Sequence, residues 1–93
     1  MNFGDAIQAM KDGKRVQRAG WNGKGMWLFL ADVPAGTYVP AVKVPPESDS
    51  GANLGCNMAG IRPCICMYDA QRMIVPGWLA SQTDMLADDW SAL

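Results

Sequence analysis

Two short segments of this sequence combine tryptophan with amide, hydroxyl and charged side chains. An indole ring offers a stacking face to a nucleobase, worth about 1–3 kcal/mol per base, and amide side chains can pair with a base edge. Carboxylates accept hydrogen bonds from ribose hydroxyls. Cationic side chains bind a diphosphate, helped by unpaired backbone N–H groups in a turn or at the start of a helix. The first segment supplies Arg18, Trp21, Asn22, Gly23 and Lys24, and the second supplies Trp78, Ser81, Gln82, Thr83 and Asp84. This inventory fits a nucleotide-like ligand.

Each of these features also has a purely structural interpretation. Tryptophans in a small protein more often lie in a core or an interface than under a ligand. Ser81 with Asp84 three residues later is the pattern of a helix cap. The glycine-rich turn after Trp21 lacks the spacing of a phosphate-binding loop. Composition alone therefore indicates a small oligomeric domain that binds something anionic and aromatic.

The absence of histidine excludes several kinds of site. No Ser-His or Cys-His nucleophile pair and no imidazole metal site can form. The three cysteines, Cys56, Cys64 and Cys66, are spaced unlike a structural zinc site, and we interpret them as small buried hydrophobes. We therefore predict no catalytic residue, no metal and no cofactor.

Size and composition indicate the number of domains, the partners and the localisation. The 93 residues predict one domain, residues 1–93. Because 49% of the residues are hydrophobic, self-association is the expected way to hide apolar surface. A net charge of −1 disfavours a nucleic acid polymer as partner. An odd cysteine count without a signal peptide, and without an apolar run long enough to span a membrane, predicts a cytoplasmic protein with no membrane contact.

The patterning predicts a small α+β domain. Apolar residues at helical spacing indicate an N-terminal helix over 3–12, capped by Asn2 and Asp5 and ended by Gly13. A short C-terminal helix follows Ser81 and runs through Ala87. The expected strands, which form an antiparallel sheet of about four or five, are 14–18, 26–31, 62–68, 73–75 and 88–93. Strand 26–31 is apolar on both faces, so we expect the first helix on one face and a loop or a neighbouring subunit on the other.

Two irregular segments interrupt this pattern. Asn22-Gly23 favours a tight hairpin turn. Residues 38–44 are expected to form a broken edge strand because of Pro40. Residues 43–63 form an irregular, insertion-like loop.

The two tryptophan segments are also where the chain resembles a known family. The resemblance rests on residues 2–6, on residues 19–26 with 28–30, and on residues 75–90. These segments are similar to a family of small phage and prophage proteins that includes the type 2 Thoeris anti-defence proteins, the cyclic ADP-ribose-isomer sponges. The resemblance covers both ends of the chain, about half of its length.

This resemblance implies a non-enzymatic protein that sequesters a cyclic ADP-ribose isomer made by TIR-domain immune enzymes. It implies a homotetramer with ligand pockets between subunits, and for some members a separate site for cyclic dinucleotides. The ligand residues that it implies are Trp21, Asn22, Trp78, Gln82, Thr83 and Asp84. Arg18 and Lys24 are our additions for the diphosphate, on physical grounds. We expect residues 74–90 to form half of a site. The other half, Trp21-Asn22, comes from elsewhere in the assembly, and the sequence does not say which subunit supplies it.

Two other functions compete with this one. A phage interaction module would use its tryptophans to contact a host protein, and they would then lie on an exposed surface. A small nucleotide-processing enzyme would use Asp84, Asp88 or Asp89, although nothing in their spacing singles out an acid–base pair.

Overall fold

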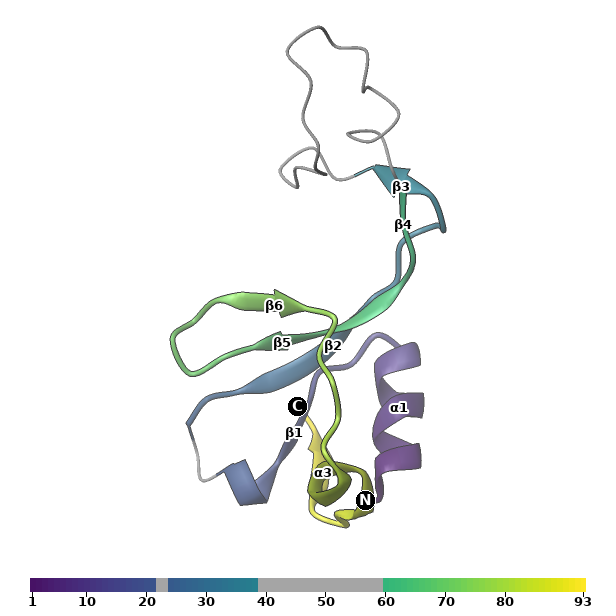
Figure 1. The fold of residues 1–93 in the computed structure, drawn as a ribbon. Coiled ribbons are helices and arrows are strands. Elements are labelled where there is room, and N and C mark those ends of the chain that lie inside the picture. The colour runs from purple at the N-terminus through teal and green to yellow at the C-terminus, as the bar shows by residue number, and fades with distance from the viewer. Residues whose placement is uncertain (22–23, 39–59) are drawn as a thin grey trace, which may run out of the picture. The chain divides into compact units, whose positions relative to one another are not determined.

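A computed structural model describes residues 1–21, 24–38 and 60–93 of the chain (Figure 1). It divides into two compact units, of which the first contains Met1–Asp32 and Cys64–Leu93, and the second is Val33–Pro63. The first unit holds both predicted helices and a five-stranded antiparallel sheet with the strand order β6-β5-β2-β1-β7. Its elements are α1 (Phe3–Lys11), β1 (Val16–Arg18), the 3-10 turn η1 (Ala19–Trp21), β2 (Trp27–Ala31), β5 (Cys64–Tyr68), β6 (Ile74–Pro76), α3 (Gln82–Leu86) and β7 (Trp90–Ala92). The predicted α+β class is confirmed.

Helix α1 forms as its sequence predicts. The Asn2 side chain accepts from the Asp5 backbone N–H at 2.8 Å, and the Asp5 carboxylate accepts from the Asn2 N–H at 3.4 Å, which closes a capping box. At the other end Gly13 takes φ +86°, a left-handed conformation that a side chain would oppose. The helix buries Ala6, Ala9 and Met10 against the sheet.

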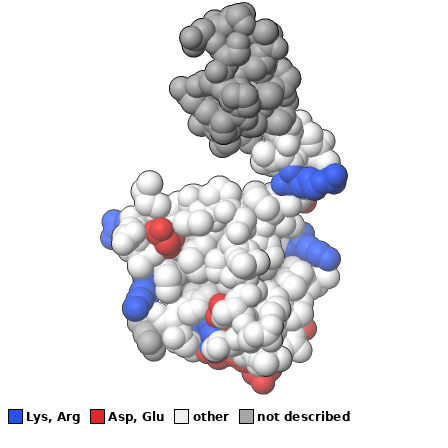
Figure 2. All heavy atoms as spheres, in the orientation of Figure 1, with Lys and Arg blue, Asp and Glu red and all other residues white. Residues whose placement is uncertain are grey.

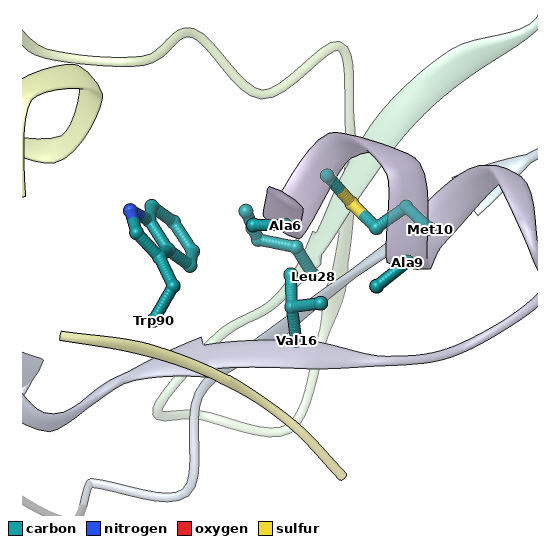
Figure 3. Packing of buried hydrophobic residues seen from close by; sticks show 6 residues of the cluster. All are labelled: Ala6, Ala9, Met10, Val16, Leu28 and Trp90. Carbon is teal, nitrogen blue, oxygen red and sulfur yellow. The ribbon is translucent and has the colours of Figure 1, made fainter. Parts of the chain in front are cut away.

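The core lies between α1 and the centre of the sheet (Figure 3). Val16 and Leu28 are direct partners across β1 and β2, and both are fully buried. The Trp90 ring comes from β7 and is 2% exposed. These residues join α1, the middle strands and the last strand in one cluster, so the C-terminal strand is a full part of the core.

The opposite face of β2 is not covered to the same extent. Trp27 and Phe29 are half-buried, and the Trp27 ring stacks on Tyr68 with centroids 4.7 Å apart. The Arg15 guanidinium lies 4.9 Å from the centroid of Trp27. The predicted helix cover is confirmed for the Leu28 face, and within the first unit the Trp27 face carries aromatic and cationic side chains.

The hairpin of β5 and β6 differs slightly from its predicted bounds. The Asp69 carboxylate accepts from the backbone N–H groups of Gln71 and Met73, both at 2.9 Å, which holds Met73 in the turn. The strand therefore begins at Ile74 and includes Pro76, after which Gly77 reverses the chain at φ +72°. On β5, Cys66 is buried and Cys64 half-buried, with their Sγ atoms 3.8 Å apart. Burial raises the pKa of the Cys66 thiol.

The second unit contains an antiparallel pair, β3 (Thr37–Tyr38) and β4 (Gly60–Ile61). A Cβ atom at Gly60 would lie 2.2 Å from the Gly36 Cα, so this close backbone approach requires glycine. The Asn22-Gly23 turn, residues 39–44 of the predicted edge strand, residues 43–59 of the insertion-like loop and Cys56 lie outside the described residues. No helix in the described ranges is long and apolar enough to cross a bilayer.

Candidate functional site

The sheet brings the two tryptophan segments together within one chain. β1 pairs with β7 so that Arg18 lies opposite Trp90, and η1 continues directly from Arg18. The turn that carries Trp21 therefore lies beside the junction of α3 and β7. The Trp21 and Trp78 ring centroids are 6.4 Å apart at 72°. Trp21 and Trp78 of one chain are therefore neighbours, because pairing of the last strand with the first holds them there.

The indole rings of Trp21, Trp78 and Trp90 pack together beside η1, α3 and β7, and we call this region the tryptophan corner. Trp90 packs edge to face against Trp21 at 5.3 Å and against Trp78 at 6.4 Å. Phe3 of α1 adds an edge contact to Trp78 and a tilted contact to Trp90. Trp90 is buried, whereas Trp21 and Trp78 are half-buried and keep part of their rings at the surface. The structural interpretation of tryptophan therefore holds for Trp90, and a stacking surface remains on the other two.

Arg18 holds the corner through two carboxylates. Its Nη1 donates to Asp84 Oδ1 at 2.6 Å, and its Nε donates to Asp89 Oδ1 at 2.8 Å. The second Asp89 oxygen accepts from the Gly20 backbone N–H at 2.7 Å and from Arg18 Nη2 at 3.4 Å. The Arg18 side chain is 13% exposed. All three guanidinium nitrogens donate hydrogen bonds to carboxylate oxygens. Its position is that of a structural bridge between β1, α3 and β7.

Hydrogen bonds stabilise the ionised form of both carboxylates. For Asp84, burial opposes ionisation, but the bonds from Arg18, Ser81 and Trp21 outweigh it and hold the pKa of the carboxyl below its usual range. For Asp89, the Arg18 bond is the main cause of a lowered pKa, with help from the Gly20 N–H. Both aspartates are therefore anionic partners of Arg18 at neutral pH.

The start of α3 places two further predicted residues at the surface. Ser81 is its N-cap, and the Ser81 Oγ accepts from the Asp84 N–H at 3.1 Å while donating to Asp84 Oδ2 at 2.9 Å. The cap that the sequence predicts is confirmed. Gln82 and Thr83 occupy the first turn and are exposed. The same turn of α3 reaches the Trp21 ring through Asp84, whose Oδ1 accepts a hydrogen bond from the Trp21 indole N–H at 3.3 Å.

The structure thus sorts the predicted ligand residues. Trp21 and Trp78 pack against each other and are half-buried. Gln82 and Thr83 are exposed in the first turn of α3, and Lys24 is exposed at the end of the Trp21 turn. Arg18 and Asp84 are bonded to one another. Asn22 lies outside the described residues.

Sequence reasoning missed two structural members of the corner, Asp89 and Trp90. Trp90 donates from Nε1 to the Asp84 backbone carbonyl at 3.0 Å, and Asp89 holds the Arg18 side chain. The pattern offered no signal for Asp89 over its neighbour Asp88. For Trp90, its position in a predicted short strand was the one available signal that it enters the core.

A cavity of about 310 Å³ opens in another part of the first unit. Its lining includes Met10, Lys14, Arg15, Trp27, Phe29 and Ile74, and none of the predicted ligand residues. Arg15 and Trp27, which contact each other, lie on one side of it, and Leu30, which packs against the core, also lines it. The tryptophan corner is therefore a surface site in the described part of one chain, separate from this cavity.

Charged side chains form small groups on the face drawn in Figure 2, and most of that face is uncharged. Such a surface suits a small ligand or a protein contact better than a polyanion.

Fold and corner together define a class: a small α+β protein in which three indoles are held beside a capped helix by a half-buried arginine bridge. The family model described as Tad2-like, a Thoeris anti-defense 2-like domain, matches residues 1–93, and the chain belongs to that family. It is also 38% identical over 92 residues to Thoeris anti-defense 2 of Bacillus phage SP01, covering 97% of this chain and 91% of that protein. The family resemblance seen in the sequence is confirmed, and the protein has a phage anti-defence role.

Proposed function

We propose that the protein suppresses Thoeris defence by binding a cyclic nucleotide signal, a cyclic ADP-ribose isomer, and keeping it from its effector without degrading it. The observation that carries this proposal is the pair of half-buried indoles, Trp21 and Trp78. Gln82 and Thr83 are exposed in the first turn of α3, which Asp84 joins to the Trp21 indole. A nucleobase can stack on an indole, gaining about 1–3 kcal/mol. The Gln82 amide suits a base edge, and the Thr83 hydroxyl suits a ribose or phosphate oxygen.

Sequestration requires tight binding without turnover. A dissociation constant of about 10 nM corresponds to about 11 kcal/mol, which stacking, hydrogen bonds and a pre-organised pocket can supply. The state of the acidic residues supports binding over catalysis. Asp84 and Asp89 are ion-paired to Arg18 and have lowered pKa values, so neither is suited to accept and return a proton near neutral pH.

A second copy of the chain would complete the pocket. The corner is open on its solvent side, and Leu79, which follows Trp78, is 90% exposed. Leu86 on α3 is 78% exposed. Exposed leucines of this kind next to a candidate site support self-association, which we propose to be a homotetramer with ligand held between subunits.

The test is depletion and recovery of ligand. Purified protein is incubated with cyclic ADP-ribose isomers, the free fraction is measured, and the bound fraction is released by heat and analysed. The proposal expects stoichiometric depletion and recovery of unaltered nucleotide. Gln82→Ala and Thr83→Ala should each weaken binding without loss of fold, because both side chains are exposed. Ala70→Ser, an exposed change in the β5–β6 turn, is the control.

Other outcomes point to other functions. Recovery of an altered nucleotide would support an enzyme. A parallel incubation with cyclic dinucleotides tests whether this protein also takes that ligand class. Absence of any depletion would leave the interaction module, which the exposed Leu79 and Leu86 favour as an apolar contact surface for a host protein.

A further inference from the structure

Arg18 has the residue type expected for a diphosphate ligand, but its environment does not suit that role. All three guanidinium nitrogens point to carboxylate oxygens, at 2.6 Å to Asp84 and at 2.8 and 3.4 Å to Asp89. Only 13% of the side chain is exposed. An incoming phosphate would have to break existing charge-assisted bonds before it could form its own.

The charges around Arg18 also disfavour phosphate binding. Two carboxylates face one guanidinium, so this group of three side chains carries a net charge of −1 at neutral pH. An anion that approached Arg18 would also meet Asp84 and Asp89, whose repulsion is strong at short range in a partly desolvated site. The corner therefore binds the uncharged parts of an anionic ligand better than its charged part.

The bridge determines where the exposed aromatic surface lies. Asp89 binds Arg18 and the Gly20 N–H together, and Asp84 binds Arg18 together with the Trp21 indole N–H at 3.3 Å. The turn that presents Trp21 is thus fastened to the first turn of α3 and to the start of β7. Without the guanidinium, two carboxylates would face each other across this junction and the turn would lose its main attachments.

We infer that Arg18 is a positioning residue of the nucleotide site, acting through Asp84 and Asp89 to hold Trp21 against α3 and making no contact with the ligand phosphates. This inference rests on the proposed function. It follows that the negative charge of the ligand is bound elsewhere. Lys24, an exposed cation at the end of the Trp21 turn, is the nearest candidate in sequence.

Gly20 offers a way to disturb the bridge while keeping every charge. A Cβ atom at Gly20 would lie 2.8 Å from Arg18 Nη2 and 3.1 Å from Asp89 Oδ2. Gly20 does not have a positive φ, so alanine would displace the guanidinium without straining the backbone. Gly4→Ala is the matched control, since its nearest contact, at 3.4 Å, is an ordinary one.

The experiment compares binding of a cyclic ADP-ribose isomer to the full chain at several salt concentrations. We expect Arg18→Lys, Arg18→Gln and Gly20→Ala each to weaken binding at least tenfold, with the slope of log Kd against log salt unchanged. A lysine keeps the charge but lacks the planar fork that lets Arg18 donate from Nε, Nη1 and Nη2 to Asp89 and Asp84 at once. Lys24→Gln should instead reduce the slope, as loss of a direct charge contact does. Near-normal binding by Arg18→Lys, or a reduced slope in Arg18→Gln, would overturn the inference.

A second readout does not need the ligand. The near-ultraviolet circular dichroism of the free protein reports the packing of Trp21, Trp78 and Trp90. Gly20→Ala should change this spectrum, and Gly4→Ala should leave it as in the wild type. If the wild type binds no nucleotide, the proposed function fails, and an unchanged Gly20→Ala spectrum would remove the positioning role as well. If the wild type binds and Gly20→Ala binds equally well, the inference alone fails.

Discussion

Asp84 accepts hydrogen bonds from the side chains of Arg18, Ser81 and Trp21, which come from three different elements. Such a carboxylate has little capacity left for a ligand hydroxyl. Its value to the proposed site is indirect, because it aligns the helix cap, the half-buried arginine and an indole. At the residue scale, the groups proposed to face the ligand are those that the bridge leaves exposed to solvent, Gln82 and Thr83 above all.

The pH dependence of stability tests the bridge. Asp84 and Asp89 have folded-state pKa values below their ordinary range, so their contribution is present above the unfolded pKa of about 3.9 and is lost as pH falls through the folded values. Urea unfolding should therefore show stability falling from about pH 5 downward. The pKa of Arg18 is raised above a value that is already far above neutral, so it adds no change in this window.

In the variants Asp84→Asn and Asp89→Asn, the free energy of unfolding should fall less steeply as the pH drops below about 5. Both variants should be less stable than the wild type at pH 7. Asp5→Asn lies in the α1 capping box, away from the bridge, and serves as the comparison. If the free energy of unfolding of the two bridge variants falls as steeply below about pH 5 as that of the wild type, other groups cause this fall.

At the scale of elements, the local patterns predicted α1, α3 and the five strands of the first unit to within two residues at each end. The strand β4 lies in residues 43–63, which were predicted to be an irregular loop, so that part of the prediction is wrong. Capping boxes, a left-handed glycine and alternating apolar residues are encoded within a few positions, so they can be read from sequence. The Arg18–Asp89 contact joins residues 71 positions apart, and no local pattern encodes it. The same is true of the β1–β7 pairing, which decides that Trp21 and Trp78 meet within one chain. The candidate site was therefore predictable as a list of residues, and its internal bonds were not.

Helix α1 provides an element-scale prediction. Asn2→Ala removes the acceptor for the Asp5 N–H, and we expect a loss of about 1 kcal/mol in the free energy of unfolding. Gln8→Ala removes an exposed side-chain bond to Asp12 on the same helix and should change stability by less than about 0.5 kcal/mol. Urea denaturation measures both. Equal effects would mean that the cap does not limit the stability of α1.

At the scale of the whole molecule, the core of the first unit is small. Its main cluster of buried residues is Ala6, Ala9, Met10, Val16, Leu28 and Trp90, of which two are alanines, and Cys66 is buried outside this cluster. Short chains bury a lower fraction of their surface than long ones, and association compensates for this. The described surface still exposes Met73, Leu79 and Leu86 to more than half of their area. In the proposed homotetramer, assembly connects stability with the site, because Leu79 follows Trp78 and Leu86 lies between Trp78 and Trp90 in sequence.

Replacing the leucines beside the corner tests that connection. On an isolated chain, Leu79→Ser with Leu86→Ser should be nearly neutral, because both side chains are already exposed. If a second copy covers them, the double variant will run as a smaller species than the wild type in size-exclusion chromatography with light scattering at micromolar concentration, and will bind the cyclic nucleotide more weakly. Leu93→Ser, at an exposed leucine beyond β7, should leave both assembly and binding unchanged. A wild type that is monomeric at that concentration, yet depletes the nucleotide fully, would place the complete pocket within one chain.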